Sequence, residues 1–157
     1  MATPMRSSVP GFKAALLARL QADPAITGLD LIVSWGNPFP DTETSELIVI
    51  GSTSNRKLEF VAGMSQANET YDLEVLTSIV GAIVNDMEPR EVRAYALSDA
   101  IAESIRTWNL AGGPLATGDG WQVNICDPID SHDQDALVTG GNREASVMQT
   151  FHVTARV

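Results

Sequence analysis

The densest group of residues that could carry chemistry lies in the segment DPIDSHDQD, from Asp127 to Asp135. Its four carboxylates and one imidazole are groups that bind divalent cations. The spacing lacks the glycine and the glutamate that an EF-hand loop carries at positions six and twelve. A catalytic site would also draw on distant segments, and the other histidine, His152, lies on a predicted strand. We interpret 127–142 as a polar, solvated loop, with a weak structural ion site and a small metal-dependent hydrolase as alternatives.

Other signatures of catalysis or nucleotide binding are missing from the sequence. The glycines at 118–120 and 140–141 lack a GxxxxGK[ST] or GxGxxG pattern and are interpreted as turns, and no GxSxG elbow occurs. The single cysteine, Cys126, excludes an internal disulfide framework and a multi-cysteine zinc site. We expect it to be a small buried hydrophobe in a strand. The sequence therefore predicts no cofactor and no enzymatic activity.

The sequence is strongly acidic. Ten Lys and Arg residues against twenty Asp and Glu residues give a net charge of −10. A surface of this sign repels phosphate, so the chain is a poor candidate for gripping nucleic acid. Two acidic segments are solvated loops or, as the alternative, the lining of a passage along which DNA moves without sticking: Asp41, Glu43 and Glu46, and Asp127, Asp130, Asp133 and Asp135.

No apolar run approaches the length of a membrane helix, and the N-terminal segment has no continuous apolar stretch typical of a secretory signal. We therefore expect no membrane partner. The 157 residues suit one α+β domain at 10–157 behind a flexible arm at 1–9.

Periodicity predicts two helices, from Pro10 to about Asp23 and from about Met87 to Ala111. The second has an apolar stripe at Ala94, Leu97, Ile101, Ile105 and Trp108. Short connections favour an antiparallel meander, so we expect a mostly antiparallel sheet with two main helices packed on it. Its predicted strands, with a turn at 52–56, are 29–35, 47–51, 57–63, 69–80, 121–126 and 145–157.

The long strand 69–80 is the expected centre of the sheet. Its alternation puts one apolar set on the core face: Tyr71, Leu73, Val75, Thr77 and Ile79. We expect the Glu69–Glu74 end to face water or a bore, and the Leu76–Val80 end to lie under the second helix or against a neighbouring subunit. Phe39, in a turn-rich segment, either tucks onto the sheet or anchors a partner. The candidate subunit or partner contacts are Phe39, Leu76, Val80, Phe151 and Val153.

Four stretches, together with the order of elements, carry a resemblance to a known family: DPAITGLDLIVSWG, NETYDLEVLTSIV, REVRAYALSDAIAESIRTW and ASVMQTFHVTARV. They resemble the tail terminator (tail completion) proteins of long-tailed bacteriophages and related gene transfer agents. The resemblance implies a homo-oligomeric ring, usually a hexamer, at the head–tail junction of a virion. Such a ring stops polymerisation of the tail tube protein, joins the tail to the head connector, and lets DNA pass without specific binding. Another neck protein, a head-closure or head–tail adaptor protein, is the alternative in the same class.

Overall fold

The computed structural model describes residues 7–28, 31–36, 46–82, 88–110, 115–138 and 142–157. Both helices lie where the periodicity predicts them, and Pro10 occupies the first turn of α1, where proline is tolerated. Within the described residues the elements are α1 (Val9–Ala22), β1 (Leu31–Trp35), β2 (Glu46–Phe60), β3 (Ala67–Ala82), α2 (Glu88–Leu110), β4 (Ala116–Gly118), β5 (Trp121–Val138) and β6 (Asn142–Arg156).

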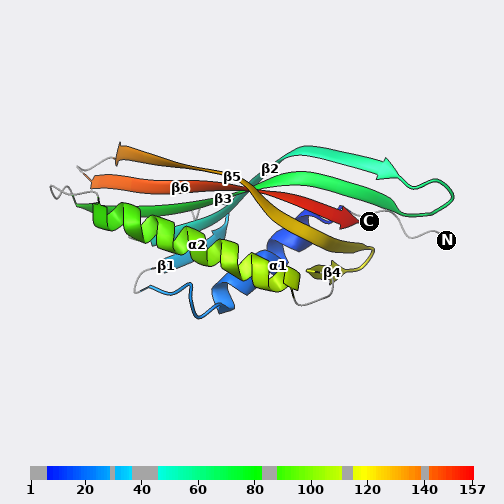
Figure 1. Cartoon of the computed structure of the whole chain (residues 1–157), viewed down its shortest axis with the longest axis horizontal. Helices are drawn as coiled ribbons and strands as arrows, with labels where there is room; N and C mark the ends of the chain where they lie inside the picture. Colours follow the sequence, from blue (N-terminus) through cyan, green and yellow to red (C-terminus); the bar gives the residue numbers. More distant parts are fainter. Residues whose placement is uncertain (1–6, 29–30, 37–45, 83–87, 111–114, 139–141) are drawn as a thin grey trace.

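The strands form one strongly twisted sheet in the order β1-β2-β3-β6-β5-β4 (Figure 1). The expectation of a mostly antiparallel sheet is wrong, because the sheet is mixed: β1 pairs in parallel with β2, from Leu31 opposite Glu46 to Trp35 opposite Ile50. A short connection normally indicates a reversal of direction. At about 3.3 Å per residue, however, the ten residues between β1 and β2 have enough length to span a five-residue strand, so the short connection does not require a reversal.

Two polar stretches that the sequence predicts to be a turn and a loop lie inside strands. The expected turn at 52–56 falls within β2, where the pairing with β3 shifts between Ile50 and Thr53 and again between Ser54 and Lys57. The expected loop at 127–142 is largely the second half of β5 and its pairing with β6, with a shift between Pro128 and Asp130. The turn-forming residues therefore mark β-bulges rather than chain reversals.

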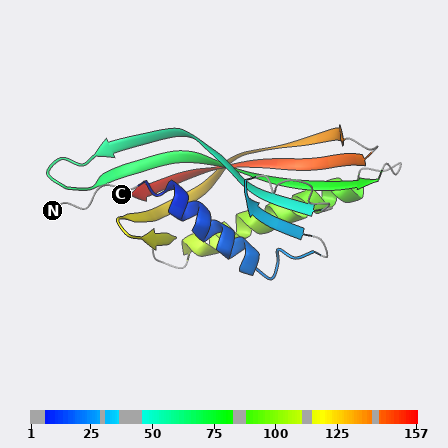
Figure 2. The ribbon, with the colours of Figure 1, turned by 180° about the vertical axis from the view of Figure 1, so that it is seen from behind.

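Both helices pack on the same face of the sheet, and no described element covers the other face (Figures 1 and 2). The core between sheet and helices includes Phe12, Leu16 and Leu20 of α1 together with Ile101 and Ile105 of α2. A smaller cluster joins Ala94 and Leu97 of α2 to Ile79 and Val147 of the sheet. The predicted stripe of α2 is therefore confirmed, with Trp108 partly buried against the main core.

The predicted core face of the central strand is also confirmed, because every residue of the set from Tyr71 to Ile79 is buried. Ile79 packs with α2 residues, whereas Leu76 and Val80, on the opposite face, are half-buried. The expectation that the Glu69 end faces water is wrong for Glu69 itself, which is fully buried. Its odd position puts it in phase with Tyr71 and Leu73, so the alternation that identifies the core face includes it.

Candidate assembly surfaces

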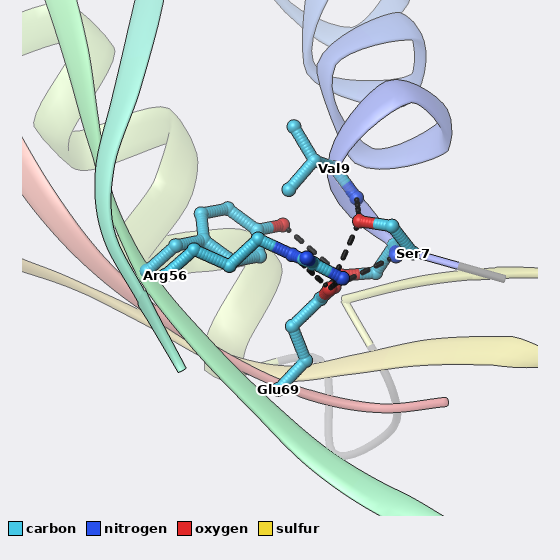
Figure 3. A network of polar contacts seen from close by, with 6 residues as sticks. Ser7, Val9, Arg56 and Glu69 are labelled. Carbon is cyan, nitrogen blue, oxygen red and sulfur yellow. Dashed lines mark hydrogen bonds and ion pairs between the residues drawn. The ribbon is translucent and has the colours of Figure 1, made fainter. Parts of the chain in front are cut away.

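A buried polar network ties the start of α1 to the β2–β3 hairpin (Figure 3). The Glu69 carboxylate of β3 accepts hydrogen bonds from the Ser8 backbone N–H at 2.8 Å and from the Ser8 hydroxyl at 2.6 Å. Ser7 donates to it at 2.9 Å, and Arg56 of β2 donates through Nε at 2.7 Å. The Ser8 hydroxyl also lies 3.2 Å from the hydroxyl of Tyr71. The network satisfies a charge that burial would otherwise make costly.

The charges of this network shift its titration. Burial by itself would raise the pKa of Glu69, but the hydrogen bonds from Ser8, Arg56 and Ser7 outweigh it and lower that pKa. Burial raises the pKa of Tyr71 well above its usual range, and the Glu69 charge adds to this effect. Glu69 is therefore held as an anion by hydrogen bonds that fix its carboxylate between the start of α1 and β2. Such an arrangement is typical of a structural carboxylate.

A second ion pair joins the start of β2 to α2. The Arg93 guanidinium donates to both carboxylate oxygens of Glu46 at 2.9 Å, and also to the backbone oxygen of Thr27 at 2.6 Å. The hydrogen bond to Glu46 raises the pKa of Arg93. Glu46, one of the acidic residues proposed from the sequence, is thus engaged on the helix side of the sheet. The other two members of that set, Asp41 and Glu43, lie outside the described residues.

The side of the sheet opposite α1 and α2 is here called the open face. Even-numbered residues of β3 and β6 point to it, together with the residues of β2 and β5 that pair with them. Its charged side chains are mainly acidic, and among the described ones they are Glu59, Asp72, Glu74, Asp127, Asp130 and Glu144, against Lys57 and Arg156.

One row of residues shows how the acids on this face are held. Asp72, His152 and Asp127 are opposite one another on β3, β6 and β5. Asp72 accepts a hydrogen bond from Asn55 at 2.8 Å and lies 2.8 Å from Nδ1 of His152. These contacts, Asn55 first, lower the pKa of Asp72. The neighbouring strands therefore keep this carboxylate ionised on the open face.

The structure separates the acidic residues of the Asp127–Asp135 segment. Asp127 and Asp130 pair with His152 and Thr150 on the open face, whereas Asp133 is opposite Val147 and interacts with Tyr95 of α2. Asp135 is opposite Ala145 in the β5–β6 ladder. β5 therefore places Asp127 and Asp130 on one face of the sheet and Asp133 on the other. A loop could have brought these carboxylates together around one ion, but a strand does not. Among the described residues, no group of three or more His, Cys, Asp or Glu side chains could hold a metal ion.

The proposed contact residues occupy two different environments. Leu76 and Val80 lie half-buried on the open face, where a neighbour could cover them. Phe151 and Val153 are fully buried in the chain's own core, and Phe39 lies outside the described residues. Cys126 is buried in β5, as expected, and burial raises the pKa of its thiol.

The tip of the β2–β3 hairpin, which projects at one end of the long axis of the molecule, was not identified from the sequence (Figure 1). Three apolar side chains there are exposed to solvent, Phe60 by 71%, Val61 by 37% and Met64 by 65%. The available signal was VAGM, an apolar run beside a glycine between two strands. Phe60, Val61 and Met64 together form a projecting apolar surface, here called the hairpin tip. A projecting group of exposed apolar side chains is a candidate contact site for another protein.

No helix within the described residues is long and apolar enough to cross a membrane.

A scan against protein-family models found no match, and a search of curated proteins found none either. Among solved structures, 28 chains match. One of them belongs to a structure described as "Virion of native gene transfer agent (GTA) particle". It superposes with a TM-score of 0.56 at 15% sequence identity, and the match covers 95% of this chain and 99% of that chain. The two chains therefore share a fold over nearly their whole lengths.

Proposed function

We propose that this chain is a structural protein of a phage or gene-transfer-agent virion, and within that class a tail terminator. The observation that carries the proposal is the likeness to a chain of a gene transfer agent particle, which spans 95% of this chain and 99% of that one. A likeness over the full length of both chains favours a module of the same kind more than a shared motif would. The four sequence stretches that resemble tail terminator proteins point to the same class.

In this role several copies, six by the resemblance, close into a ring on the head-proximal end of the tail tube. The ring prevents further tube subunits from adding and presents its other end to the head connector. The chain then acts at the head–tail junction through its surfaces and carries out no chemical step.

The charge of the open face supports the proposal, in which this face forms the wall of the bore. Its acids outnumber its cations, and the whole chain carries a net charge of −10. Like charge keeps the DNA phosphates from binding, so DNA slides past. The helices, on the opposite face, would then form the outer surface of the ring. This assignment gives the acidic residues of β3 and β5 one shared role.

The hairpin tip supports axial docking. It lies at the end of the long strands β2 and β3 and projects away from the body of the molecule along their direction (Figure 1). Exposed Phe60 and Met64 offer the apolar contact that a neighbouring ring of a different protein would cover. We assign the hairpin tip to the contact with the tube or with the head connector.

Tube polymerisation tests this function directly. Purified tail tube protein encoded by the same genome is allowed to polymerise with and without this chain, and the tubes are imaged by electron microscopy. A terminator produces shorter tubes that carry one extra disc of density at one end. Tubes of unchanged length with no bound chain would contradict the assignment, and binding to the connector alone would replace it with a neck protein.

A further inference from the structure

One side of β1 and one side of β5 have no strand beside them within the described residues. β1 ends the described sheet and is paired with β2. At the other end of the sheet β4 pairs with β5 only at 121–123, which leaves the following residues of β5 without a neighbour. Such uncovered strands expose backbone N–H and C=O groups that readily pair with another strand. We call the side of β1 turned away from β2 the β1 edge, and the side of β5 turned away from β6, at 131–135, the β5 edge.

The β1 edge and the β5 edge lie at the same height along the strands. The pairings across the sheet place Leu31 of β1 in one row with Asp135 of β5, and Trp35 in one row with Ser131. Because β1 is parallel to β2 and the pairs β2/β3, β3/β6 and β6/β5 are antiparallel, β1 and β5 run in opposite directions. A rotation about an axis along the strands therefore brings the β5 edge of one copy beside the β1 edge of the next, antiparallel and without a shift.

The backbone groups on the two edges are also in phase. The carbonyl of Val33 accepts a hydrogen bond from the Gln21 side chain at 3.2 Å, whereas the N–H of Gly36 donates to Ile50 of β2 at 3.0 Å. The odd residues of β1 thus turn their N–H and C=O groups outward. Successive residues point these groups to opposite sides of a strand, and this alternation, carried through the paired rows, turns those of Asp133 outward on β5. Val33 and Asp133, in the same row, can then exchange two hydrogen bonds.

An open groove of about 440 Å³ beside the β1 edge leaves room for the added strand. Gln21 of α1, the segment 26–28 and residues 31–33 of β1 line it. The hydrogen bond from Gln21 to Val33 is exposed and lies at the long end of the usual range, so an incoming strand N–H can replace it at low cost. Asp133 of the added strand would lie opposite Val33 on the helix side, where the released Gln21 amide can donate to its carboxylate.

Charge favours joining unlike edges over joining two β5 edges. Asp133 is exposed on the β5 edge, so a two-fold pairing of β5 with β5 about this residue would put carboxylate against carboxylate. Among the residues of β1 and those paired with them on β2, Glu46 is the single acid, and it is paired with Arg93. The β1 edge therefore accepts an acidic strand, and the added strand would cover part of the exposed Trp35.

We propose that the β5 edge of one copy pairs antiparallel with the β1 edge of the next copy, with Val33 opposite Asp133 and Ser34 opposite His132. The contact is heterologous, since each copy uses two different edges, and a heterologous contact whose rotation closes makes a ring. The open faces stay on one side across the junction, so the joined sheets form one continuous inner wall. This inference rests on the proposed ring function and names the surfaces that build the ring.

Cysteine cross-linking tests this register. Ser34 and His132 are in one row on the open face and would form a pair without mutual backbone hydrogen bonds, in which the Cα atoms are about 4.5 Å apart. That spacing suits a disulfide. Ser34→Cys and His132→Cys are purified separately, mixed in equal amounts with the tail tube protein of the same genome, and oxidised mildly. The mixture should give at least ten times more covalent dimer than either variant alone.

A matched control separates the proposed contact from random collision. Ser34→Cys mixed with Thr150→Cys should give no dimer, because Thr150 lies on the open face of β6, inside the sheet. The native Cys126 is buried and present in every sample, so the wild type gives its background. A chain that carries both replacements, at positions 34 and 132, should give a ladder of covalent multimers whose longest member counts the copies in the ring.

Proline at position 133 gives a test that does not depend on where a cysteine is placed. The N–H of Asp133 turns to the free side of β5, so Asp133→Pro removes a donor from the contact between copies and spares the pairing with β6. Asp133→Ala keeps the N–H and is the matched control. In the His132→Cys chain the proline should lower the yield of mixed dimer at least fivefold, and the alanine should leave most of it. Should the proline variant unfold in a thermal melt, the cross-linking of the mixture decides alone.

Dimers that form as well with Ser34→Cys alone would indicate two β1 edges side by side, and dimers with His132→Cys alone would indicate two β5 edges. Either result would overturn the proposal, and so would a mixture that yields no more dimer than the Thr150→Cys control. A folded proline variant that cross-links as fully as the alanine variant would overturn it as well. The tube-length experiment separates these failures from a failure of the proposed function, because it records termination whichever surfaces form the ring.

Discussion

The Glu69 carboxylate accepts hydrogen bonds from the backbone N–H and the hydroxyl of Ser8, 61 residues earlier in the chain, at 2.8 and 2.6 Å. The same carboxylate pairs with Arg56 across the β2–β3 hairpin at 2.7 Å. One buried anion therefore fixes the entry into α1 and the base of the projecting hairpin at the same time. The hairpin that carries the tip is held in place from this point.

Replacing Glu69 with Gln should lower stability at neutral pH by about 1–3 kcal/mol, because it removes the charged hydrogen bonds to Arg56 and Ser8. The pKa of Glu69 is lowered from its ordinary value of 4.5, so the carboxylate stabilises the fold fully above that value. The contribution is lost as pH falls through the lower pKa of the folded state. Thermal melts of the two proteins should thus differ most above about pH 5 and converge in acid. A difference that stays constant down to about pH 2 would contradict this role of Glu69.

Replacing Gly11 with Ala should destabilise the protein, although alanine normally stabilises a helix by about 1 kcal/mol relative to glycine. A Cβ at Gly11 would overlap the ring of Trp121, which also lies against Gly118. The expected loss is about 1–3 kcal/mol in chemical denaturation. The double variant with Trp121→Leu provides the control, because alanine should cost less once the ring is gone. Equal effects of Gly11→Ala in both backgrounds would contradict the contact.

Replacing Phe60 and Met64 with Ser should weaken docking to the tube or connector without affecting the fold. Both side chains are mostly exposed, so the melting temperature should stay close to that of the wild type. Binding to preformed tubes, measured by co-sedimentation, should fall at least tenfold. Val92→Ser is the matched control, since Val92 is a 61% exposed apolar residue of α2, away from the tip. A normal affinity of the Ser variant for both tube and connector would remove the hairpin tip from the docking surface.

Reversing charges on the open face should impair DNA delivery by the particle more than it impairs folding. Glu74→Lys combined with Asp127→Lys puts cations where phosphate would pass, and cations retain DNA electrostatically. Particles should assemble in normal numbers but deliver DNA at least tenfold less often, and the purified variant should bind DNA at low salt. Glu91→Lys with Asp99→Lys, on exposed positions of α2, makes the same change in net charge on the opposite face. Equal delivery by the two double variants would contradict the bore assignment.

Periodicity predicted the parts of the fold in which one face is buried and the other is not. The stripe of α2 and the core face of β3 follow from it, because burial on one side imposes a period on the sequence. It failed for 52–56 and for 127–135, since an edge strand that meets water tolerates polar residues and bulges that look like turns. The parallel pairing of β1 with β2 could not be predicted either, because periodicity carries no information on strand direction.

The candidate surfaces were predicted only in part. The acids of the Asp127–Asp135 segment were identified, but their division between two faces depends on the bulge at Pro128 and Asp130.

A cryo-electron microscopy map of the particle encoded by the same genome, at a resolution that traces the chain, would test the ring and its inner wall together. We predict a single closed ring of this chain between the tail tube and the head connector. In that ring the open face lines the bore. A map that places the chain elsewhere in the particle, or lacks it altogether, would contradict the proposed function.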